Sequence, residues 1–322
     1  MEKIKVFITG ESGNIATSLI SELKTKNEYE IINFLPNVEE QKEDVRVNYK
    51  GTYFNASNEI NILKKDVLKK IFEDHKPDIV IHTAAMVNTD KCEQNEKDAT
   101  QVNEIGSKNV AELAKNAGSY LINFSTTATF DTEDYEYPDN LMTETTKRKP
   151  HTHYGKTKMK GEEIIKEVYA SCSDKLLNIL PVFIFGYYPN DNASAIVKMI
   201  YAAKNKQKTI VKLSKDNFKN YFWCEDAAKA IIQLIEKKTS GDIILSNYAQ
   251  EARKFGDILN ILCKTLKMRK YDFMKYVKLR PKEDYLHQHI AGNMKLVSEI
   301  GEYEITNFNE AIKKVVESVE TL

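Results

Sequence analysis

Apolar residues recur at helical spacing in several parts of the chain. In Lys64–His75 (KKDVLKKIFEDH) they are Val67, Leu68, Ile71 and Phe72, which form one stripe along an α-helix. Charged residues occupy most other positions, so we expect one side to pack and the other to face solvent. Lys76-Pro77 ends this pattern, and DIVIH at positions 78–82 follows as a short apolar run typical of a buried strand.

The same alternation of strand and helix runs through the first part of the chain. The predicted strands are Lys3–Thr9, Tyr29–Leu35, Asp78–His82, Ser119–Ser125 and Lys175–Phe185. The predicted helices follow the first strand to about Asn27 and then cover Lys64–His75, Asn103–Ala117 and Lys156–Ala170. Strands alternating with helices of this length indicate a parallel sheet covered on both faces. We therefore predict an α/β fold with a Rossmann-type doubly wound parallel sheet.

The pattern changes beyond about Gly186, where the alternation weakens and its spacing becomes irregular. A smaller C-terminal lobe is expected to start there. We predict a first domain over residues 1–185, rejoined by about residues 220–250, and a second lobe made mostly of residues 186–322.

Composition narrows the class of protein. The chain has 322 residues, 42% of them hydrophobic, and its 47 basic and 47 acidic side chains cancel. This balance gives no general attraction to nucleic acid or to an acidic membrane surface. The N-terminal MEKIKVFITG runs directly into strand-like sequence without a signal peptide, and no apolar run reaches the ~18–20 residues of a membrane helix. The four cysteines form no CxxC pair. We expect a reduced, cytoplasmic protein.

A glycine-rich turn, TGESGNIA, joins the first strand to the first helix. Gly10, Gly13 and Ala16 are spaced G-x-x-G-x-x-A. A pyrophosphate can approach a helix N-terminus closely where the turn has no Cβ atoms, and Ala16 allows close packing of helix on strand. An ordinary β–α turn is the alternative, but this position in the chain favours dinucleotide binding.

The preference between NAD and NADP is open. The second strand of such a fold usually ends in an acid for the adenosine ribose or an arginine for a 2′-phosphate. Here it ends in INFLPN, with Leu35 and Asn37 and neither charge. Arg46 and the Glu39-Glu40 pair follow, and they could reach the ribose or lie in an exposed loop.

Tyr154 and Lys158 are four residues apart and share one face of a predicted helix. A free phenol has a pKa of ~10, which is too high for acid–base work at neutral pH. A nearby ammonium and an oxidised nicotinamide both favour phenolate, and a shift of ~3 units is worth about 4 kcal/mol. Such a tyrosine can protonate a carbonyl oxygen while a hydride arrives from a cofactor. The alternative for this pair is a plain surface helix.

Two HxH pairs, His151/His153 and His287/His289, suggest a metal site. A catalytic zinc usually needs three protein ligands, and no matching third partner is evident, so we expect no metal. The run KMKGEEIIKE after Tyr154 and Lys158 is expected to be a solvated helix face, with an ion pair between Lys158 and Glu162.

Five motifs stand in a characteristic order: TGESGNIA, HTAA (82–85), QVNEIG (101–106), FSTTATF (124–130) and YGKTK (154–158). Together they resemble the extended short-chain dehydrogenase/reductase family, also called the NAD-dependent epimerase/dehydratase family. The resemblance runs through about residues 1–190. Within the family the chain is most similar to the dTDP-4-dehydrorhamnose reductase branch, whose patterns are matched by HTAAMVNTDKCE, STTATF and YGKTKMKGE. Later LPVFIFG, KNYFWCEDAA and RPKEDYL resemble further family segments.

The resemblance implies roles for particular residues. Tyr154 would exchange the proton, Lys158 would also bond the nicotinamide ribose, and Thr126 would share the carbonyl oxygen. The positions implied to bind cofactor are Gly10, Gly13, Asn14, Ile15, Asn61, Ile62, Thr83, Ala84, Ala85, Asn103, Ser125, Tyr154, Lys158 and Pro181. The positions implied to bind substrate are Met86, Thr127, Lys219 and Arg280. Arginine suits a diphosphate because it can bond two phosphate oxygens, although a surface ion pair is the alternative for Arg280.

Departures from the family pattern put the exact sugar nucleotide in question. Family dehydratases follow the catalytic threonine with an acidic pair, whereas Thr127 and Ala128 follow it here, so a dehydratase is not expected. The arginine expected before Pro181 is Leu180, and the asparagine expected before the Ile196–Lys198 segment is Ala195.

Three functions remain open. The first is an NAD(P)H-dependent reductase of the 4-keto group of a nucleotide-linked 6-deoxysugar. The second is a nucleotide-sugar epimerase, which would hold NAD tightly and consume none. The third is a non-catalytic nucleotide-binding subunit, similar to the regulatory subunit of methionine adenosyltransferase, which would not need the Thr126, Tyr154 and Lys158 trio. The family often dimerises through the helices before its fifth and sixth strands, which would make this protein a homodimer.

Overall fold

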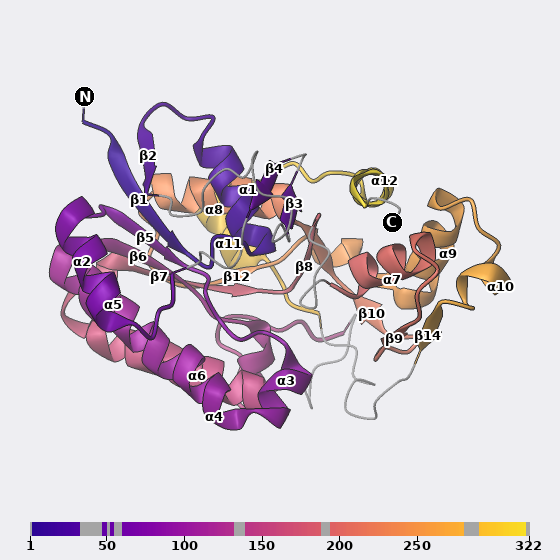
Figure 1. The fold of residues 1–322 in the computed structure, drawn as a ribbon, viewed down its shortest axis with the longest axis horizontal. Helices are drawn as coiled ribbons and strands as arrows, with labels where there is room; N and C mark the ends of the chain where they lie inside the picture. The colour runs from indigo at the N-terminus through magenta and orange to yellow at the C-terminus, as the bar shows by residue number, and fades with distance from the viewer. Residues whose placement is uncertain are drawn as a thin grey trace.

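Six strands form one parallel sheet at the centre of the molecule (Figure 1). The computed structural model describes residues 2–32, 47–49, 52–54, 60–131, 139–187, 194–279 and 290–319. Within these ranges the strand order is β12-β7-β6-β5-β1-β2, and every neighbouring pair is parallel. The strands are β1 (Ile4–Thr9), β2 (Tyr29–Ile32), β5 (Ile79–His82), β6 (Tyr120–Phe124), β7 (Leu176–Pro181) and β12 (Gly241–Leu245). The predicted doubly wound fold is confirmed.

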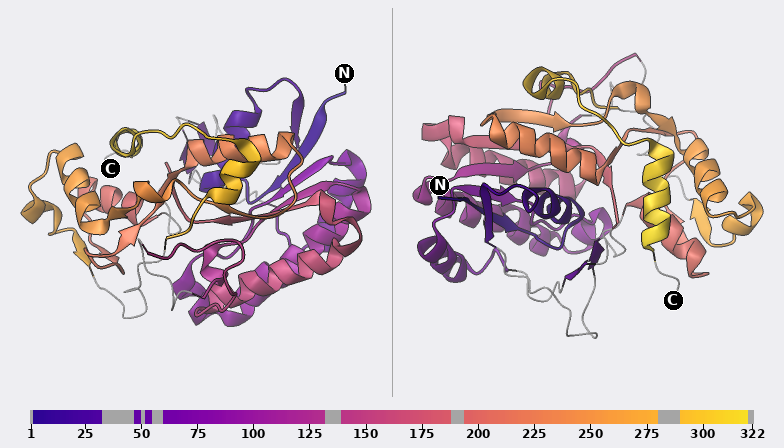
Figure 2. Two further views of the ribbon diagram at one scale, coloured as in Figure 1. Left: turned by 180° about the vertical axis from the view of Figure 1, so that it is seen from behind. Right: turned by 90° about the horizontal axis from the view of Figure 1, so that it is seen from above.

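Helices cover both faces of this sheet (Figures 1 and 2). One face packs against α1 (Asn14–Leu23), α8 (Cys224–Glu236) and α11 (Met294–Ile300). The other packs against α2 (Lys65–His75), α5 (Ser107–Ala117) and α6 (His153–Val168). In α2 the predicted stripe holds for Leu68, Ile71 and Phe72, which are buried, whereas Val67 is 53% exposed. Strands buried on both faces need apolar side chains on both, which explains their continuous apolar runs.

The predicted strand Lys175–Phe185 is divided in the structure. Its first part, β7, pairs with β6 and β12 in the central sheet. Its second part, β8 (Phe183–Phe185), leaves the sheet and pairs with β11 (Tyr221–Trp223). Pro181 ends β7, and proline lacks the amide hydrogen that would continue a strand ladder. The apolar pattern does not reveal this change of partner.

A second core lies beyond β8, at the right of Figure 1. It gathers apolar side chains from α7 (Ala195–Lys204), α9 (Phe255–Thr265), α10 (Lys270–Phe273) and α12 (Phe308–Ser318). Short strand pairs complete it: β9 (Thr209–Val211) with β14 (Val277–Leu279), and β10 (Phe218–Lys219) with β13 (Arg253–Lys254). Between these segments, α8 and β12 return to the first core. The domain limits at 185 and 220–250 remain a prediction, which this separation of cores supports.

The remaining elements are short. They are β3 (Val47–Tyr49), β4 (Thr52–Phe54), α3 (Thr89–Gln94), α4 (Glu96–Thr100), the π-helix η2 (Gln101–Gly106) and the 3-10 turns η3 (Thr127–Thr129), η4 (Ala170–Lys175) and η5 (Ala249–Glu251). No helix among the described residues has the length and apolar character needed to cross a lipid bilayer.

The outer edge of β12 is closed by side chains from other segments. Glu144 accepts a hydrogen bond from the Ile244 amide at 2.9 Å, and Lys295 donates to the Asp242 carbonyl oxygen at 2.7 Å. Met142 and Ala291 form an isolated parallel bridge nearby. An exposed strand edge with free amides can pair with other chains, so these contacts protect it.

Gly161 allows α6 to pack closely against the π-helix η2. A Cβ at this position would fall well inside van der Waals distance of the Asn103 carbonyl oxygen. We expect Gly161→Ala to lower the free energy of unfolding by about 2–3 kcal/mol, because a rigid backbone cannot move aside. In an uncrowded helix the same change would add about 1 kcal/mol of stability.

Urea denaturation followed by circular dichroism measures this difference. Lys160→Ala is the control, because Lys160 is the exposed neighbour on the same helix. A Gly161→Ala variant as stable as the wild type would contradict the close approach of α6 to η2.

Candidate active site

A cleft of about 800 Å³ opens at the carboxyl ends of the central strands. Its walls are the β1–α1 turn, the ends of β5, β6 and β7, helix α6 and parts of the second lobe. The strand order reverses between β1 and β5, and the carboxyl side of such a switch point is where open α/β sheets bind ligands. The volume lies in the ordinary range for cofactor sites.

Most residues predicted at the cofactor line this cleft. They are Gly10, Gly13, Asn14, Ile15, Asn61, Ile62, Thr83, Ala84, Ala85, Ser125, Tyr154, Lys158 and Pro181. Asn103 does not line it. Its side chain instead accepts a hydrogen bond from the Met86 amide at 2.8 Å and donates one to Thr157 Oγ1 at 3.0 Å. Asn103 therefore links the segment after β5 to helix α6.

The β1–α1 turn has the geometry that a pyrophosphate needs. Gly10 has a φ of +72°, and an added Cβ would lie 2.7 Å from the Ala84 amide nitrogen. The Gly13 amide donates to the Gly10 carbonyl at 2.9 Å, and α1 begins at the next residue. Gly13 has no side chain to occupy the first amides of α1, so they remain directed at a ligand. The turn fits the phosphates of a dinucleotide.

The far end of the cleft is formed by Asn61 and Ile62. The Asn61 side chain accepts from the Leu63 amide at 2.9 Å, and Asn109 donates to the Ile62 carbonyl at 3.1 Å. These bonds hold the short segment in place. The positions considered for the adenosine ribose (Leu35, Asn37, Glu39, Glu40 and Arg46) and for the substrate diphosphate (Arg280) lie outside the described residues.

Tyr154 and Lys158 both project from the first two turns of α6. The helix starts where Thr152 accepts a hydrogen bond from the Gly155 amide at 3.1 Å, an ordinary N-cap. Lys158 is 5% exposed, and its Nζ donates to the Phe124 carbonyl at 2.7 Å. Burial lowers the pKa of Lys158 to about 8. Tyr154 hydrogen-bonds with Thr126, so the three predicted residues converge.

The protein shifts the pKa of Tyr154 upward. Loss of water around the ring raises the pKa to about 12, although the hydrogen bond with Thr126 opposes this. The sequence predicted a lowered pKa for Tyr154, caused by a nearby ammonium together with the positive charge of an oxidised nicotinamide. Lys158 is itself buried and directed at a carbonyl oxygen, so the protein's own groups favour the neutral phenol.

Of the predicted substrate residues, the three that the structure describes, Met86, Thr127 and Lys219, are not among the residues that line the cleft. Thr127 donates to the Pro181 carbonyl at 3.2 Å. Lys219 is 1% exposed, and its ammonium lies 4.4 Å from the centre of the Phe183 ring, which does line the cleft. Burial lowers the pKa of Lys219 to about 8. The substrate roles of these residues remain predictions.

The second lobe contributes groups that the sequence patterns did not indicate. Ile210 of β9 is a large, partly exposed apolar residue on the cleft wall, together with Phe183 of β8 and Val87 of the first domain. Across the cleft, Lys212 of the second lobe forms an ion pair with Asp90 of α3. Spacing alone does not show such pairs, because 122 residues separate the partners.

Among the described residues, neither the histidines nor the cysteines line the cleft. His82 is buried between Thr9 and Ser107, and burial lowers its pKa to about 3, so it is neutral. His153 contacts the Glu96 carbonyl at 3.1 Å. No cluster of three metal-ligating side chains occurs in the described part of the chain, and His287 and His289 lie outside it. Cys92 and Cys224 are buried.

Glu162 departs from the predicted solvated face of α6. It is buried at 6% exposure, accepts from Ser125 Oγ at 2.6 Å, and pairs with Lys166 and Arg148 at 2.7 and 3.4 Å. The predicted ion pair with Lys158 does not form, because Lys158 turns towards the Phe124 carbonyl. In the sequence, the only indication of a role for Glu162 is its four-residue spacing from Lys158. The same spacing is equally typical of an ion pair on a helix surface.

Comparison with known proteins agrees with this geometry. Residues 4–252 match the family described as RmlD substrate binding domain. The dTDP-4-dehydrorhamnose reductase of Aggregatibacter actinomycetemcomitans is 25% identical over 240 residues, 74% of this chain and 70% of that protein. Methionine adenosyltransferase 2 subunit beta of Xenopus laevis is 31% identical over 106 residues, 33% of this chain and 30% of that subunit.

A solved structure shares the fold. The dTDP-4-dehydrorhamnose reductase of Bacillus anthracis in complex with NADP superposes with a TM-score of 0.70 and 20% identity, covering 97% of this chain and 98% of that chain. The matched residues include the glycine turn, Thr126, Tyr154 and Lys158, which the structure brings to one cleft. The chain belongs to the RmlD substrate-binding domain family, a branch of the extended short-chain dehydrogenase/reductases.

Proposed function

We propose that this protein is an NAD(P)H-dependent reductase of the 4-keto group of a nucleotide-linked 6-deoxysugar. The observation that carries the proposal is the convergence of Tyr154, Thr126 and Lys158 beside a glycine turn fitted for a dinucleotide. The dTDP-4-dehydrorhamnose reductases among its relatives are named for this reaction type.

In the proposed reaction, the bound dinucleotide supplies the hydride. Tyr154 donates its phenolic proton to the oxygen of the reduced carbonyl, and the Thr126 hydroxyl orients that oxygen through a second hydrogen bond. Lys158 would hold the ribose of the cofactor, and its ammonium would compensate the charge of the phenolate formed. A raised Tyr154 pKa, to about 12, keeps the phenol protonated at neutral pH, which is the form that a reduction consumes.

The raised pKa of Tyr154 also favours the reductase over the epimerase. An epimerase first removes a proton from the sugar hydroxyl, so its tyrosine must begin as phenolate. The surroundings of Tyr154 favour the phenol, which supports the reductase. A dehydratase would need an acid next to Thr126, and Thr127 and Ala128 provide none.

Nucleotide-sugar and cofactor binding are divided between the two units in this proposal. The first domain holds NAD or NADP at the residues that line its part of the cleft. The nucleotide sugar binds between the first domain and the second lobe, with Met86 and Thr127 of the first domain and Lys219 and Arg280 of the later part of the chain as the proposed contacts. A cytoplasmic location belongs to the same proposal and is supported by four free cysteines.

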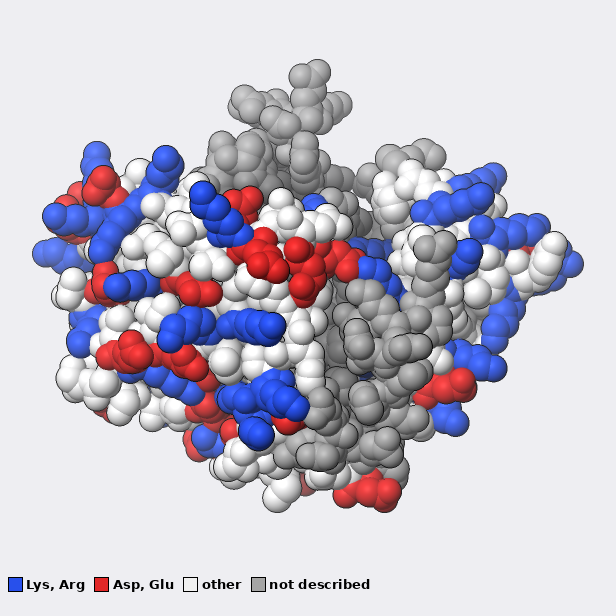
Figure 3. Space-filling view, turned by 90° about the horizontal axis from the view of Figure 1, so that it is seen from below, with Lys and Arg blue, Asp and Glu red and all other residues white. Residues whose placement is uncertain are grey.

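A homodimer through the helices before the fifth and sixth strands would be polar in this protein. The exposed residues of α6 are Lys156, Lys160, Glu163, Lys166 and Glu167. Figure 3 shows basic and acidic side chains interspersed on the face seen from below. Such a surface suits solvent or a salt-sensitive contact more than a large apolar interface.

Cofactor oxidation tests the proposed function. Purified protein is incubated with NADPH or NADH and a panel of dTDP-, UDP-, GDP- and CDP-linked 4-keto-6-deoxysugars. We expect stoichiometric oxidation of the cofactor with at least one sugar. Sugar interconversion without net oxidation, with NAD retained through purification, would identify an epimerase. Bound nucleotide without turnover of any sugar would identify a non-catalytic subunit.

A further inference from the structure

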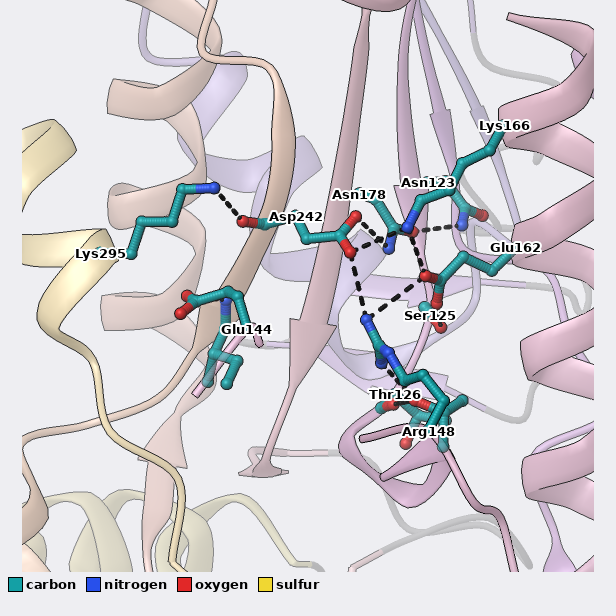
Figure 4. Close-up of polar contacts among 12 residues, drawn as sticks. Asn123, Ser125, Thr126, Glu144, Arg148, Glu162, Lys166, Asn178, Asp242 and Lys295 are labelled. Atoms are coloured by element: carbon teal, nitrogen blue, oxygen red, sulfur yellow. Dashed lines mark hydrogen bonds and ion pairs between the residues drawn. The ribbon is translucent and has the colours of Figure 1, made fainter. Parts of the chain in front are cut away.

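A row of polar residues crosses the sheet face beneath α6. Asn123 of β6, Asn178 of β7 and Asp242 of β12 lie in register on adjacent strands (Figure 4). Asn123 Nδ2 donates to Asn178 Oδ1 at 2.7 Å, and Asn178 Nδ2 donates to Asp242 Oδ1 at 3.1 Å. Both asparagines are almost completely buried. Polar groups in such a layer cost free energy unless they are paired, so this row calls for an explanation.

Two cations join the row to a carboxylate on α6. Arg148 Nη2 lies 3.2 Å and Lys166 Nζ 2.8 Å from Asp242 Oδ2. The same two nitrogens lie 3.4 and 2.7 Å from Glu162 Oε1. The other oxygen, Glu162 Oε2, accepts the hydroxyl of Ser125 at 2.6 Å. Figure 4 shows these side chains converging from the sheet, α6 and the preceding loop.

Arg148 is held rigidly where it makes these contacts. Its Nη1 donates to Thr129 Oγ1 at 2.5 Å, and its guanidinium carbon lies 4.2 Å from the centre of the Phe130 ring. Thr129 Oγ1 in turn donates to the Thr126 carbonyl at 2.8 Å. The planar guanidinium suits several directed bonds at once, which a lysine could not reproduce.

The network ends at the groups that are proposed to react. Ser125, the partner of Glu162, stands between Phe124 and Thr126. The Phe124 carbonyl accepts the Lys158 ammonium, and Thr126 hydrogen-bonds with Tyr154. Glu162 therefore fixes the segment that holds both reacting side chains.

Glu162 also acts on the charge of Lys158, which lies one helical turn earlier. Burial lowers the pKa of Lys158 to about 8, and the negative charge of Glu162 opposes this shift. The other titratable side chains near Lys158 are Tyr154 on the same helix and His82 from β5, which is neutral with a pKa of about 3. Glu162 itself faces Arg148 and Lys166, and Asp242 balances these two cations.

Stability alone does not account for this arrangement. Buried ion pairs give little net stabilisation, and apolar residues of similar volume often pack as well or better. We propose that Glu162, held in place by Arg148, is a positioning residue for the reduction: it fixes the Ser125 hydroxyl and keeps the Lys158 ammonium charged beside Tyr154. This inference rests on the proposed reductase function.

The first test measures the titration of Lys158 without any substrate. Competitive acetylation over a range of pH, followed by mass spectrometry of the peptide, reports the pKa of this cleft-lining lysine. Glu162→Gln keeps the shape but removes the negative charge, so the neutral amine becomes more favoured. We expect the pKa of Lys158 to fall by about one unit or more. An unchanged titration overturns the proposal.

The second test compares rates. In Glu162→Gln the alkaline limb of kcat/KM should move to lower pH, following the Lys158 titration. Arg148→Met should lower kcat about tenfold, as for a misplaced catalytic group, with a smaller effect on the KM for the cofactor. The variant that carries both Glu162→Gln and Arg148→Met should be no slower than Glu162→Gln alone, because the two substitutions break the same Arg148–Glu162 interaction. Arg148→Lys should restore little of the rate.

Arg253→Met is the matched control. Arg253 also pairs with a glutamate, Glu251 at 3.0 Å, and its guanidinium carbon lies 5.3 Å from the centre of the Phe308 ring, but it belongs to the second lobe. Its pH profile should match the wild type. Additive effects of Glu162→Gln and Arg148→Met, or an equal pH shift in Arg253→Met, would overturn the proposal. If wild-type protein reduced no sugar while the Lys158 titration still shifted, the proposed function would fail and the electrostatic role of Glu162 would stand.

Discussion

Replacing Tyr154 with phenylalanine should reduce kcat/KM for the 4-keto sugar by about three orders of magnitude, the usual scale for losing a general acid. The phenol is the group placed to protonate the carbonyl oxygen, and its partner Thr126 has no acidic proton to replace it. Phenylalanine preserves the packing of the ring, so the fold and the affinity for NADPH should change little. Steady-state kinetics and cofactor fluorescence measure the two effects separately.

Thr126→Val serves as the comparison for this variant. It removes the second hydrogen bond but leaves the acid, so its loss of kcat/KM should be smaller than that of Tyr154→Phe. If Tyr154→Phe kept most of the wild-type rate, the proton would have to come from another group and the assignment of the trio would be wrong.

Substitution of Gly10 by alanine should weaken NADPH binding at least about 100-fold, a loss of some 3 kcal/mol. A Cβ at this position would lie 2.7 Å from the Ala84 amide nitrogen and 2.9 Å from Thr83 Oγ1, so β1 and β5 would have to separate at the phosphate turn. The positive φ of 72° adds about 1–2 kcal/mol of backbone strain. Titration of cofactor fluorescence and thermal unfolding measure both consequences.

Gly118→Ala is the control that separates the effect of backbone strain from the effect of steric crowding at Gly10. Gly118 ends α5 with a φ of +76°, but a Cβ there meets nothing within 4 Å among the described residues. It should show the backbone strain as a small loss of stability and leave NADPH affinity unchanged. Equal cofactor affinities in Gly10→Ala and Gly118→Ala would show that the close approach of the turn to Ala84 has no part in binding.

Local patterns and the family resemblance together predicted cofactor positions that the structure brings to one cleft. The glycine turn follows β1, HTAA begins at the end of β5, and Pro181 ends β7. These positions are all at carboxyl ends of parallel strands, which a doubly wound sheet brings to one edge. Tyr154 and Lys158 could be paired because four-residue spacing on a helix determines a shared face. Thirteen of the fourteen predicted cofactor positions line the cleft, and Asn103 is the exception.

Other features depend on partners that are distant along the chain. The separation of β8 from β7 depends on β11, and the burial of Lys219 depends on Phe183 and the second core. The lysine and glutamate run after Tyr154 has the composition of a solvated helix face. However, Glu162 pairs with Arg148, 14 residues away, and shares its two cations with Asp242, which lies 76 residues beyond Lys166.

By itself, the sequence determined the α/β class, the position of the dinucleotide turn and the residues expected to transfer the proton. These properties follow from contacts within one β–α unit or one helix, where spacing sets geometry. Only the tertiary structure decided that the protein's own groups raise the pKa of Tyr154 and lower that of Lys158, and that Glu162 is buried. Solvent exclusion and charge pairing depend on everything that packs around a group, and no local pattern specifies that environment.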